Sequence, residues 1–115
     1  MTTKPLISIG VTTYDRKNLL IETLNSILTQ KFNDYEIIVG NDNPNRIVNE
    51  KFTGINDNRI KYINNRGNLG GWKNLQNLLK ISNGIYFTSL ADDDLYSPVL
   101  LESIYKSIMD FNYPD

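Results

Sequence analysis

The sequence contains no cysteine and no histidine. Without cysteine, the chain can form neither a disulfide framework nor a thiolate zinc site. Without histidine, it cannot use Ser-His-Asp or Cys-His catalysis, and it cannot bind a metal ion through imidazole. Any chemistry must therefore come from carboxylates, amides, hydroxyls, lysine, arginine and the backbone.

A strong net charge and a long apolar run are also missing. The 115 residues carry 12 Lys and Arg against 13 Asp and Glu, for a net charge of −1. This balance excludes a basic nucleic-acid footprint and a polybasic membrane patch. No signal peptide opens the sequence, and no segment is long enough to span a bilayer. We therefore expect a cytoplasmic protein without a nucleic-acid partner, at most peripheral to the membrane in a full-length form.

The length and the 40% hydrophobic content fit one domain in which strands and helices alternate. The expected strands cover residues 6–11, 36–40, 59–63 and 85–90. The expected helices cover residues 17–30, 72–82 and 98–110, with a short helix at 47–52. This alternation predicts right-handed βαβ units, and hence a three-layer α/β/α fold with a mostly parallel sheet.

The same pattern predicts which helical residues face the core and where the helices end. The inward positions are Leu20, Leu24, Ile27 and Leu28 in the first long helix and Leu75, Leu78 and Leu79 in the second. Asp15 is expected to cap the start of the first helix. Asn83 and Gly84 are expected to close the second.

Three consecutive acids, Asp92, Asp93 and Asp94, follow directly on the last apolar run. Neighbouring carboxylates repel each other, so a compact fold tolerates them best around a cation. A hard ion such as Mg²⁺ or Mn²⁺ that carries phosphates suits these oxygen ligands. The simpler interpretation is a solvated acidic turn before a helix.

Polar residues follow all four expected strands. They are Thr12, Thr13 and Tyr14 after the first, Asp42 after the second, Arg66 and Asn68 after the third, and the acidic triplet after the fourth. In a parallel sheet these positions share one edge, which is where ligands bind in open α/β folds. The shared edge favours a ligand site over a solvated turn.

The kind of nucleotide can be narrowed from the same residues. There is no P-loop motif. The glycines at 67–71 do not match the dinucleotide-binding motif G-x-G-x-x-G, and they follow the third strand rather than the first. A dinucleotide site is therefore not expected. Asp42 could hold a ribose, or it could accept a hydrogen bond from a ring N–H of uracil, thymine or guanine. Tyr14 could stack on that base, or it could pack on the first helix.

Five segments follow one another in a specific order and spacing. They are residues 11–16, 20–30, 35–42, 68–70 and 84–98. Together they closely resemble the start of the family 2 glycosyltransferases, over nearly the whole chain. The resemblance implies the Rossmann-like GT-A fold and a nucleotide-diphosphate-sugar donor, most simply a UDP-sugar. It also implies a divalent metal, Mn²⁺ or Mg²⁺, and a glycan or lipid-linked acceptor.

The resemblance also assigns roles on the nucleotide side by position. Thr12 and Tyr14 would contact the base, and Asp42 would accept the hydrogen bond from uracil N3–H. Asn68 belongs to the matching loop after the third strand, and Asp92 would lie near the ribose or the metal-bound waters.

The metal and diphosphate assignments are affected by two departures from the family. Asp93 is the first choice for the direct metal ligand and Asp94 the second, because Ala91 stands where the family often has the first acid of D-x-D-D. The family often has Ala-Arg-Asn on the next helix, whereas this chain has Trp-Lys-Asn. Lys73 or Arg66 would then supply positive charge to the diphosphate, unless both are simply solvated.

The sequence offers no candidate for the acceptor-side general base, which the family places in a second half. We therefore expect residues 1–115 to be a truncated, donor-binding part of a larger enzyme. Apolar surface left by truncation could drive self-association. The alternatives are a nucleotidyltransferase, whose expected Gly- and basic-rich loop after the first strand is replaced by Thr12-Thr13-Tyr14, and a non-catalytic nucleotide-sugar-binding module.

Overall fold

A computed structural model describes residues 4–91 of the chain. The acidic triplet and the helix expected at 98–110 lie outside this range. The elements are β1 (Ile7–Thr13), α1 (Lys17–Leu28), β2 (Tyr35–Asn41), α2 (Glu50–Thr53), β3 (Ile60–Asn64), α3 (Gly71–Ile81) and β4 (Tyr86–Ala91). Every strand and helix expected in this range is present, with ends that differ from the prediction by at most three residues.

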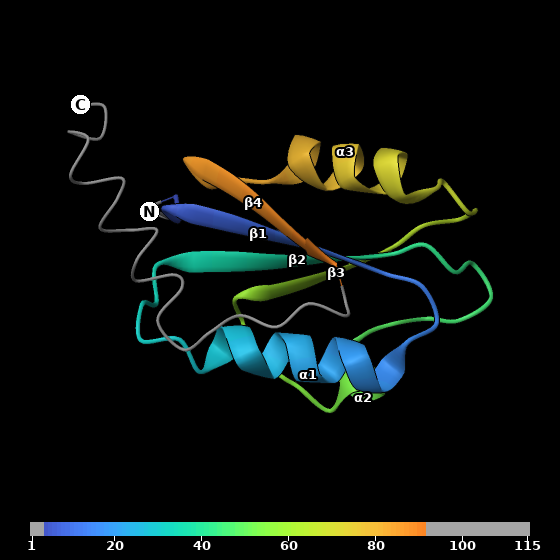
Figure 1. The fold of residues 1–115 in the computed structure, drawn as a ribbon, viewed down its shortest axis with the longest axis horizontal. Helices are drawn as coiled ribbons and strands as arrows, with labels where there is room; N and C mark the ends of the chain where they lie inside the picture. Colours follow the sequence, from blue (N-terminus) through green and yellow to red (C-terminus); the bar gives the residue numbers. More distant parts are fainter. Residues whose placement is uncertain (1–3, 92–115) are drawn as a thin grey trace.

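The four strands form one parallel sheet in the order β3-β2-β1-β4. Helices α1 and α2 lie on one face of the sheet, and α3 lies on the other (Figure 1). The predicted three-layer α/β/α fold is therefore confirmed. Because all strands are parallel, their carboxyl ends lie at one edge, which we call the carboxyl edge.

The main hydrophobic core lies between the sheet and α1. Alternate residues of β1 and β2 point into it, and Leu20, Leu24 and Ile27 of α1 pack against them with no exposed surface. This arrangement confirms the predicted inner face of the first helix. Leu28 packs on the core only in part.

The face under α3 is built differently from the prediction. Of the three leucines expected to point inward, only Leu78 is fully buried, whereas 52% of Leu79 is exposed and Leu75 is half-buried. The second buried position of α3 is Asn74, four residues before Leu78. Residues four apart share one helix face, so α3 packs on the sheet through an amide and a leucine.

Both expected helix caps were wrong. The N-cap of α1 is Arg16, and Asp15 has a positive φ of 55° and contacts the Arg46 Nε at 3.4 Å instead. Helix α3 ends at Ser82, whose backbone is extended. Gly84 lies beyond the cap, and a Cβ there would stand 2.6 Å from the Ser8 backbone nitrogen, so close packing on β1 explains this glycine.

A buried carboxylate joins the first three strands to the loop before β4. Glu36 accepts hydrogen bonds from the Ser8 hydroxyl at 2.5 Å and the Asn83 N–H at 2.6 Å, and it pairs with the Lys61 ammonium at 3.2 Å. Burial alone would raise the pKa of Glu36. The three donors outweigh it and hold the pKa below its ordinary value.

This network makes folding stability depend on pH. A carboxyl group whose pKa is lower in the folded chain stabilises the fold above its unfolded pKa, and this contribution disappears as the pH falls through the folded pKa. We expect Glu36→Gln to reduce the free energy of unfolding by about 1–2 kcal/mol at pH 7, and to flatten its decline under acid. Urea unfolding between pH 3 and pH 7 measures both effects.

Glu22→Gln, on the exposed side of α1, is the matched control and should leave the pH profile of the wild type in place. Identical pH profiles for Glu36→Gln and the wild type would contradict the role given to Glu36.

Candidate functional site at the carboxyl edge

The structure places the predicted nucleotide residues that it describes along the carboxyl edge. Thr12 lies near the end of β1, in register with Gly40 of β2 and Ala91 of β4. Asp42 follows β2 directly, and its N–H donates to the Thr13 carbonyl at 3.0 Å. The three acids predicted to hold metal and ribose lie outside the described residues.

The Asp42 carboxylate is the best-defined group at this edge. It is 6% exposed and accepts three hydrogen bonds from the loop that follows β3. Oδ1 accepts from the Leu69 N–H at 2.8 Å and the Asn65 Nδ2 at 3.1 Å, and Oδ2 accepts from the Gly70 N–H at 2.9 Å. A carboxylate has about four acceptor positions, so residues 4–91 leave one of them open, on Oδ2.

These bonds also secure the start of α3. Its N-cap, Gly70, has a φ of 84° and has no side chain with which to cap the helix. Asp42, just after β2, accepts the N–H of this N-cap residue and of Leu69 before it, and it places negative charge near the positive end of the helix. Sequence reasoning located Asp42 at the edge but did not foresee this second role.

Two asparagines extend the hydrogen bonds of Asp42 into the sheet. The Asn65 Nδ2 donates both to Asp42 and, at 3.0 Å, to the Asn74 Oδ1. The Asn74 Nδ2 donates to the Gly40 carbonyl at 3.0 Å. A Cβ on Gly40 would stand 2.5 Å from the Asn74 Oδ1, so the glycine is what allows α3 to come this close.

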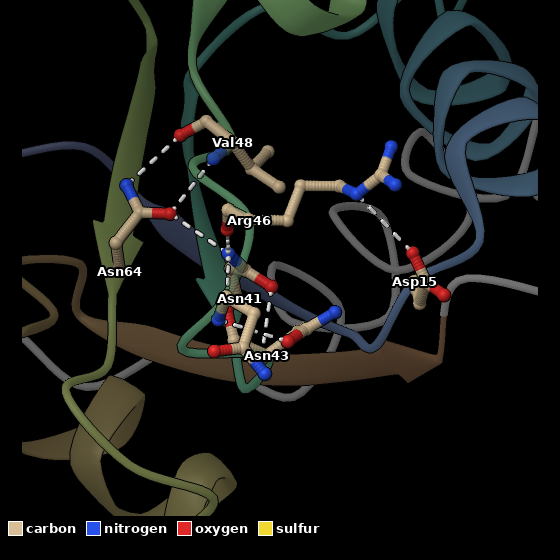
Figure 2. Close-up of polar contacts among 7 residues, drawn as sticks. Asp15, Asn41, Asn43, Arg46, Val48 and Asn64 are labelled. Atoms are coloured by element: carbon tan, nitrogen blue, oxygen red, sulfur yellow. Dashed lines mark hydrogen bonds and ion pairs between the residues drawn. The ribbon is translucent and has the colours of Figure 1, made fainter.

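A second amide network holds the loop after β2, on the opposite face of the sheet (Figure 2). Asn41 and Asn64 are register partners, and the Asn41 Nδ2 donates to the Asn64 Oδ1 at 2.8 Å and to the Arg46 carbonyl at 2.6 Å. Asn64 also accepts from the Val48 N–H at 2.8 Å and donates to its carbonyl at 2.9 Å. The loop is thus fixed at both ends.

The other predicted nucleotide residues are available at the surface. Tyr14, just after β1, has 49% of its surface exposed, and Thr12 is half-buried. The Asn68 side chain accepts from the Gly70 N–H at 3.0 Å and is otherwise exposed. Lys73 and Arg66 are exposed on the first turn of α3 and in the loop before it.

Within residues 4–91, no three acidic side chains converge as they would need to in order to hold a metal ion. The Asp42 Oδ1 already accepts two N–H groups, so it has no lone pair left for a cation. Asp93 and Asp94, the metal ligands expected from the sequence, lie outside residues 4–91.

A hollow of about 690 Å³ lies at the opposite edge of the sheet, where the strands begin. Four of its five charged side chains, those of Asp34, Glu36, Arg59 and Lys61, already have partners inside the chain. The Arg59 guanidinium bonds to Asp57 at 2.8 Å, and Lys61 pairs with Glu36. We therefore place the functional site at the carboxyl edge.

Sequence reasoning missed all four asparagines of the two networks. The available signal was the pairing of polar residues at the ends of two neighbouring strands, Asn41-Asp42 and Asn64-Asn65. Consecutive residues along a strand direction point to opposite faces, so Asn41 and Asn64 meet on one face of the sheet and Asp42 and Asn65 on the other. The signal at Asn74 was its match to the Asn of the Ala-Arg-Asn that the family often has on this helix.

The Asn41 network predicts a large cost for a small substitution. Asn41→Ala removes the hydrogen bond to the Arg46 carbonyl and one of the two bonds that the Asn64 Oδ1 accepts. It should lower the free energy of unfolding by about 2–3 kcal/mol. Asn45→Ala, an exposed change in the same loop, should cost less than about 0.5 kcal/mol. Chemical unfolding of the two variants measures the difference, and equal stability would contradict the network's role.

Comparison with known proteins identifies the family. Residues 8–113 match the model of the family described as Glycosyl transferase family 2. It is 37% identical over 93 residues to a GalNAc(5)-diNAcBac-PP-undecaprenol beta-1,3-glucosyltransferase of Campylobacter jejuni, covering 78% of this chain and 30% of that protein. It is 34% identical over 107 residues to an uncharacterized glycosyltransferase of Methanocaldococcus jannaschii, covering 90% and 37%.

Solved structures share the fold. TarS of S. aureus, residues 1–349 in complex with UDP, superposes with a TM-score of 0.80 at 23% identity, covering 93% of this chain and 33% of that one. The mannosyltransferase PcManGT from Pyrobaculum calidifontis, in complex with GDP-Man and Mn²⁺, superposes with a TM-score of 0.76 at 17% identity, covering 93% and 33%.

Two further facts set the scope of the comparison. The chain spans about a third of the length of the curated relatives that it matches first. No helix within residues 4–91 has the length and apolar character to cross a membrane. On the strength of the family match and the shared fold, the chain belongs to the family 2 glycosyltransferases.

Proposed function

We propose that this chain is the donor-binding part of a longer glycosyltransferase and that it binds a nucleotide-diphosphate sugar, with uridine as the nucleoside, at the carboxyl edge. The observation that carries the proposal is the Asp42 carboxylate, fixed at this edge with one acceptor position left on Oδ2. A carboxylate that can only accept selects a base with a ring N–H. Uracil and guanine have one, and cytosine does not.

The comparisons support this choice of ligand. TarS has been solved with UDP and with UDP-GlcNAc, and PcManGT with GDP-Man. Both bases carry the ring N–H that the free acceptor of Asp42 requires. The two structures are under 25% identical to this chain, so they support the nucleotide class and leave the sugar open.

The surrounding residues would complete the nucleotide site. Tyr14 is exposed just after β1, the strand that pairs with β2, and it would stack on the base. Thr12 would contact the edge of the base. Asn68 and Lys73 lie on the loop and first helical turn that Asp42 holds, on the side where the diphosphate would follow. Lys73 would supply positive charge to it, and Asp92 would approach the ribose.

The metal ligands in this proposal are Asp93 and Asp94. Their carboxylates suit Mn²⁺ or Mg²⁺, and PcManGT was solved with Mn²⁺. When bound, the ion would act as a Lewis acid that neutralises the charge of the departing nucleoside diphosphate. The acceptor, a glycan or a lipid-linked glycan, and the general base would belong to the rest of the enzyme, which we expect to work in the cytoplasm.

Calorimetric titration of the purified chain tests the nucleotide assignment. UDP with Mn²⁺ should bind at least tenfold more tightly than CDP with Mn²⁺. Asp42→Asn should remove most of this preference, because an amide can turn its NH₂ toward the ring nitrogen of cytosine. Glu22→Gln is the charge-matched control on the far side of α1. Equal binding of UDP and CDP by the wild type would overturn the assignment of Asp42.

The metal assignment is tested separately. UDP binding should weaken at least tenfold when the metal is chelated with EDTA, and by a similar factor in Asp93→Ala titrated with Mn²⁺ present. An Asp93→Ala chain that still gains affinity from Mn²⁺ as the wild type does would transfer the metal role to Asp94. UDP binding that ignores both the chelator and the substitution would contradict metal dependence altogether.

A further inference from the structure

Asn74 is a polar residue in a fully buried position. It is 1% exposed and points at the sheet from the inner face of α3, where an apolar side chain would pack without any polar group to satisfy. Burying an amide is costly unless its hydrogen bonds are made. Asn74 makes one on each side of its amide, to the Gly40 carbonyl and from the Asn65 Nδ2, both at 3.0 Å.

These two bonds fix which way the Asn74 amide faces. Its Nδ2 must meet the Gly40 carbonyl, which can only accept, so its Oδ1 must meet Asn65. The Asn65 Nδ2 then uses one hydrogen on Asn74 and the other on the Asp42 Oδ1, at 3.1 Å. One of the three hydrogen bonds that orient the carboxylate therefore belongs to a chain of hydrogen bonds that ends at the Gly40 carbonyl of β2.

The backbone of β2 is shaped for this contact. A Cβ at Gly40 would stand 2.5 Å from the Asn74 Oδ1 and 3.0 Å from the Leu78 Cδ2. Only a glycine lets the helix approach the strand closely enough for the amide to reach the carbonyl. Gly40 lies two residues before Asp42, which directly follows β2, and Asn74 and Asn65 connect the Gly40 carbonyl to the Asp42 carboxylate.

From this geometry we propose that Asn74 is a positioning residue for nucleotide recognition. Acting through Asn65 and the Gly40 carbonyl, it holds the Asp42 carboxylate so that the free acceptor on Oδ2 faces outward, toward the base. This inference rests on the proposed function for its ligand. Asn74 itself touches neither the nucleotide nor the reacting atoms.

The test compares Asn74→Ala with the wild type by two measurements on the whole chain. The first is amide hydrogen exchange at Leu69 and Gly70, whose N–H groups bond to Asp42. Their exchange should become at least tenfold faster in the variant, while the core amide of Val39 keeps its wild-type rate. The second is the ratio of the Kd values for CDP and UDP, each titrated with Mn²⁺. The ratio should fall about five- to tenfold, because the directed acceptor is lost for UDP alone.

Two further variants guard against a simple folding defect. Asn65→Ala removes the middle of the chain of hydrogen bonds from a half-buried position and should give the same pair of effects. Gln76→Ala, exposed on the same helix, should give neither. A merely structural role would weaken UDP and CDP binding by the same factor.

Unchanged exchange at Leu69 and Gly70 in both Asn74→Ala and Asn65→Ala would overturn the proposal. So would faster exchange with the wild-type ratio of Kd values. A wild-type chain that binds UDP and CDP equally contradicts the proposed function instead, and the exchange rates alone then support or overturn the hold on Asp42.

Discussion

The candidate site depends on one carboxylate, that of Asp42, which accepts three hydrogen bonds from the loop after β3. Asp42 joins the end of β2 to the loop before α3 through the N–H groups of Leu69 and Gly70 and through Asn65. A buried carboxylate is costly unless its oxygens are satisfied, and here the loop satisfies all but one acceptor position. The same bonds that stabilise the charge fix the loop and the start of α3, where the proposed binding residues Asn68 and Lys73 lie.

The geometry of parallel strands explains why such an anchor can be built from so few residues. Strand side chains alternate between faces, so the paired residues Asn41-Asp42 and Asn64-Asn65 form one amide network on each face of the sheet. The network around Asn41 fixes the loop after β2, and the network around Asp42 fixes the loop after β3. Both loops that border the nucleotide position are held before any ligand arrives, which lowers the entropic cost of binding.

Much of this could be predicted from the sequence, because hydrophobic periodicity decides the order of elements and parallel strands bring their carboxyl ends to one edge. Asp42 and Tyr14 were placed at that edge correctly. The partners of Asp42 could not be predicted, since they are backbone N–H groups and amides 23 to 28 residues away. The expected caps were wrong because Asp15 has a positive φ and precedes the N-cap Arg16, and because α3 already ends at Ser82 while the Asn83 N–H bonds to Glu36. The predicted inward face of α3 was wrong because Asn74 is buried, where it makes hydrogen bonds, whereas Leu79 is exposed.

A crystal structure of the chain with UDP and Mn²⁺ tests the central claim most directly. We expect uracil N3 to lie within hydrogen-bonding distance of the Asp42 Oδ2, while the Leu69 and Gly70 N–H groups remain bonded to the same carboxylate. A uracil ring bound away from Asp42, or a carboxylate that has left the loop in order to reach the ring, would contradict it.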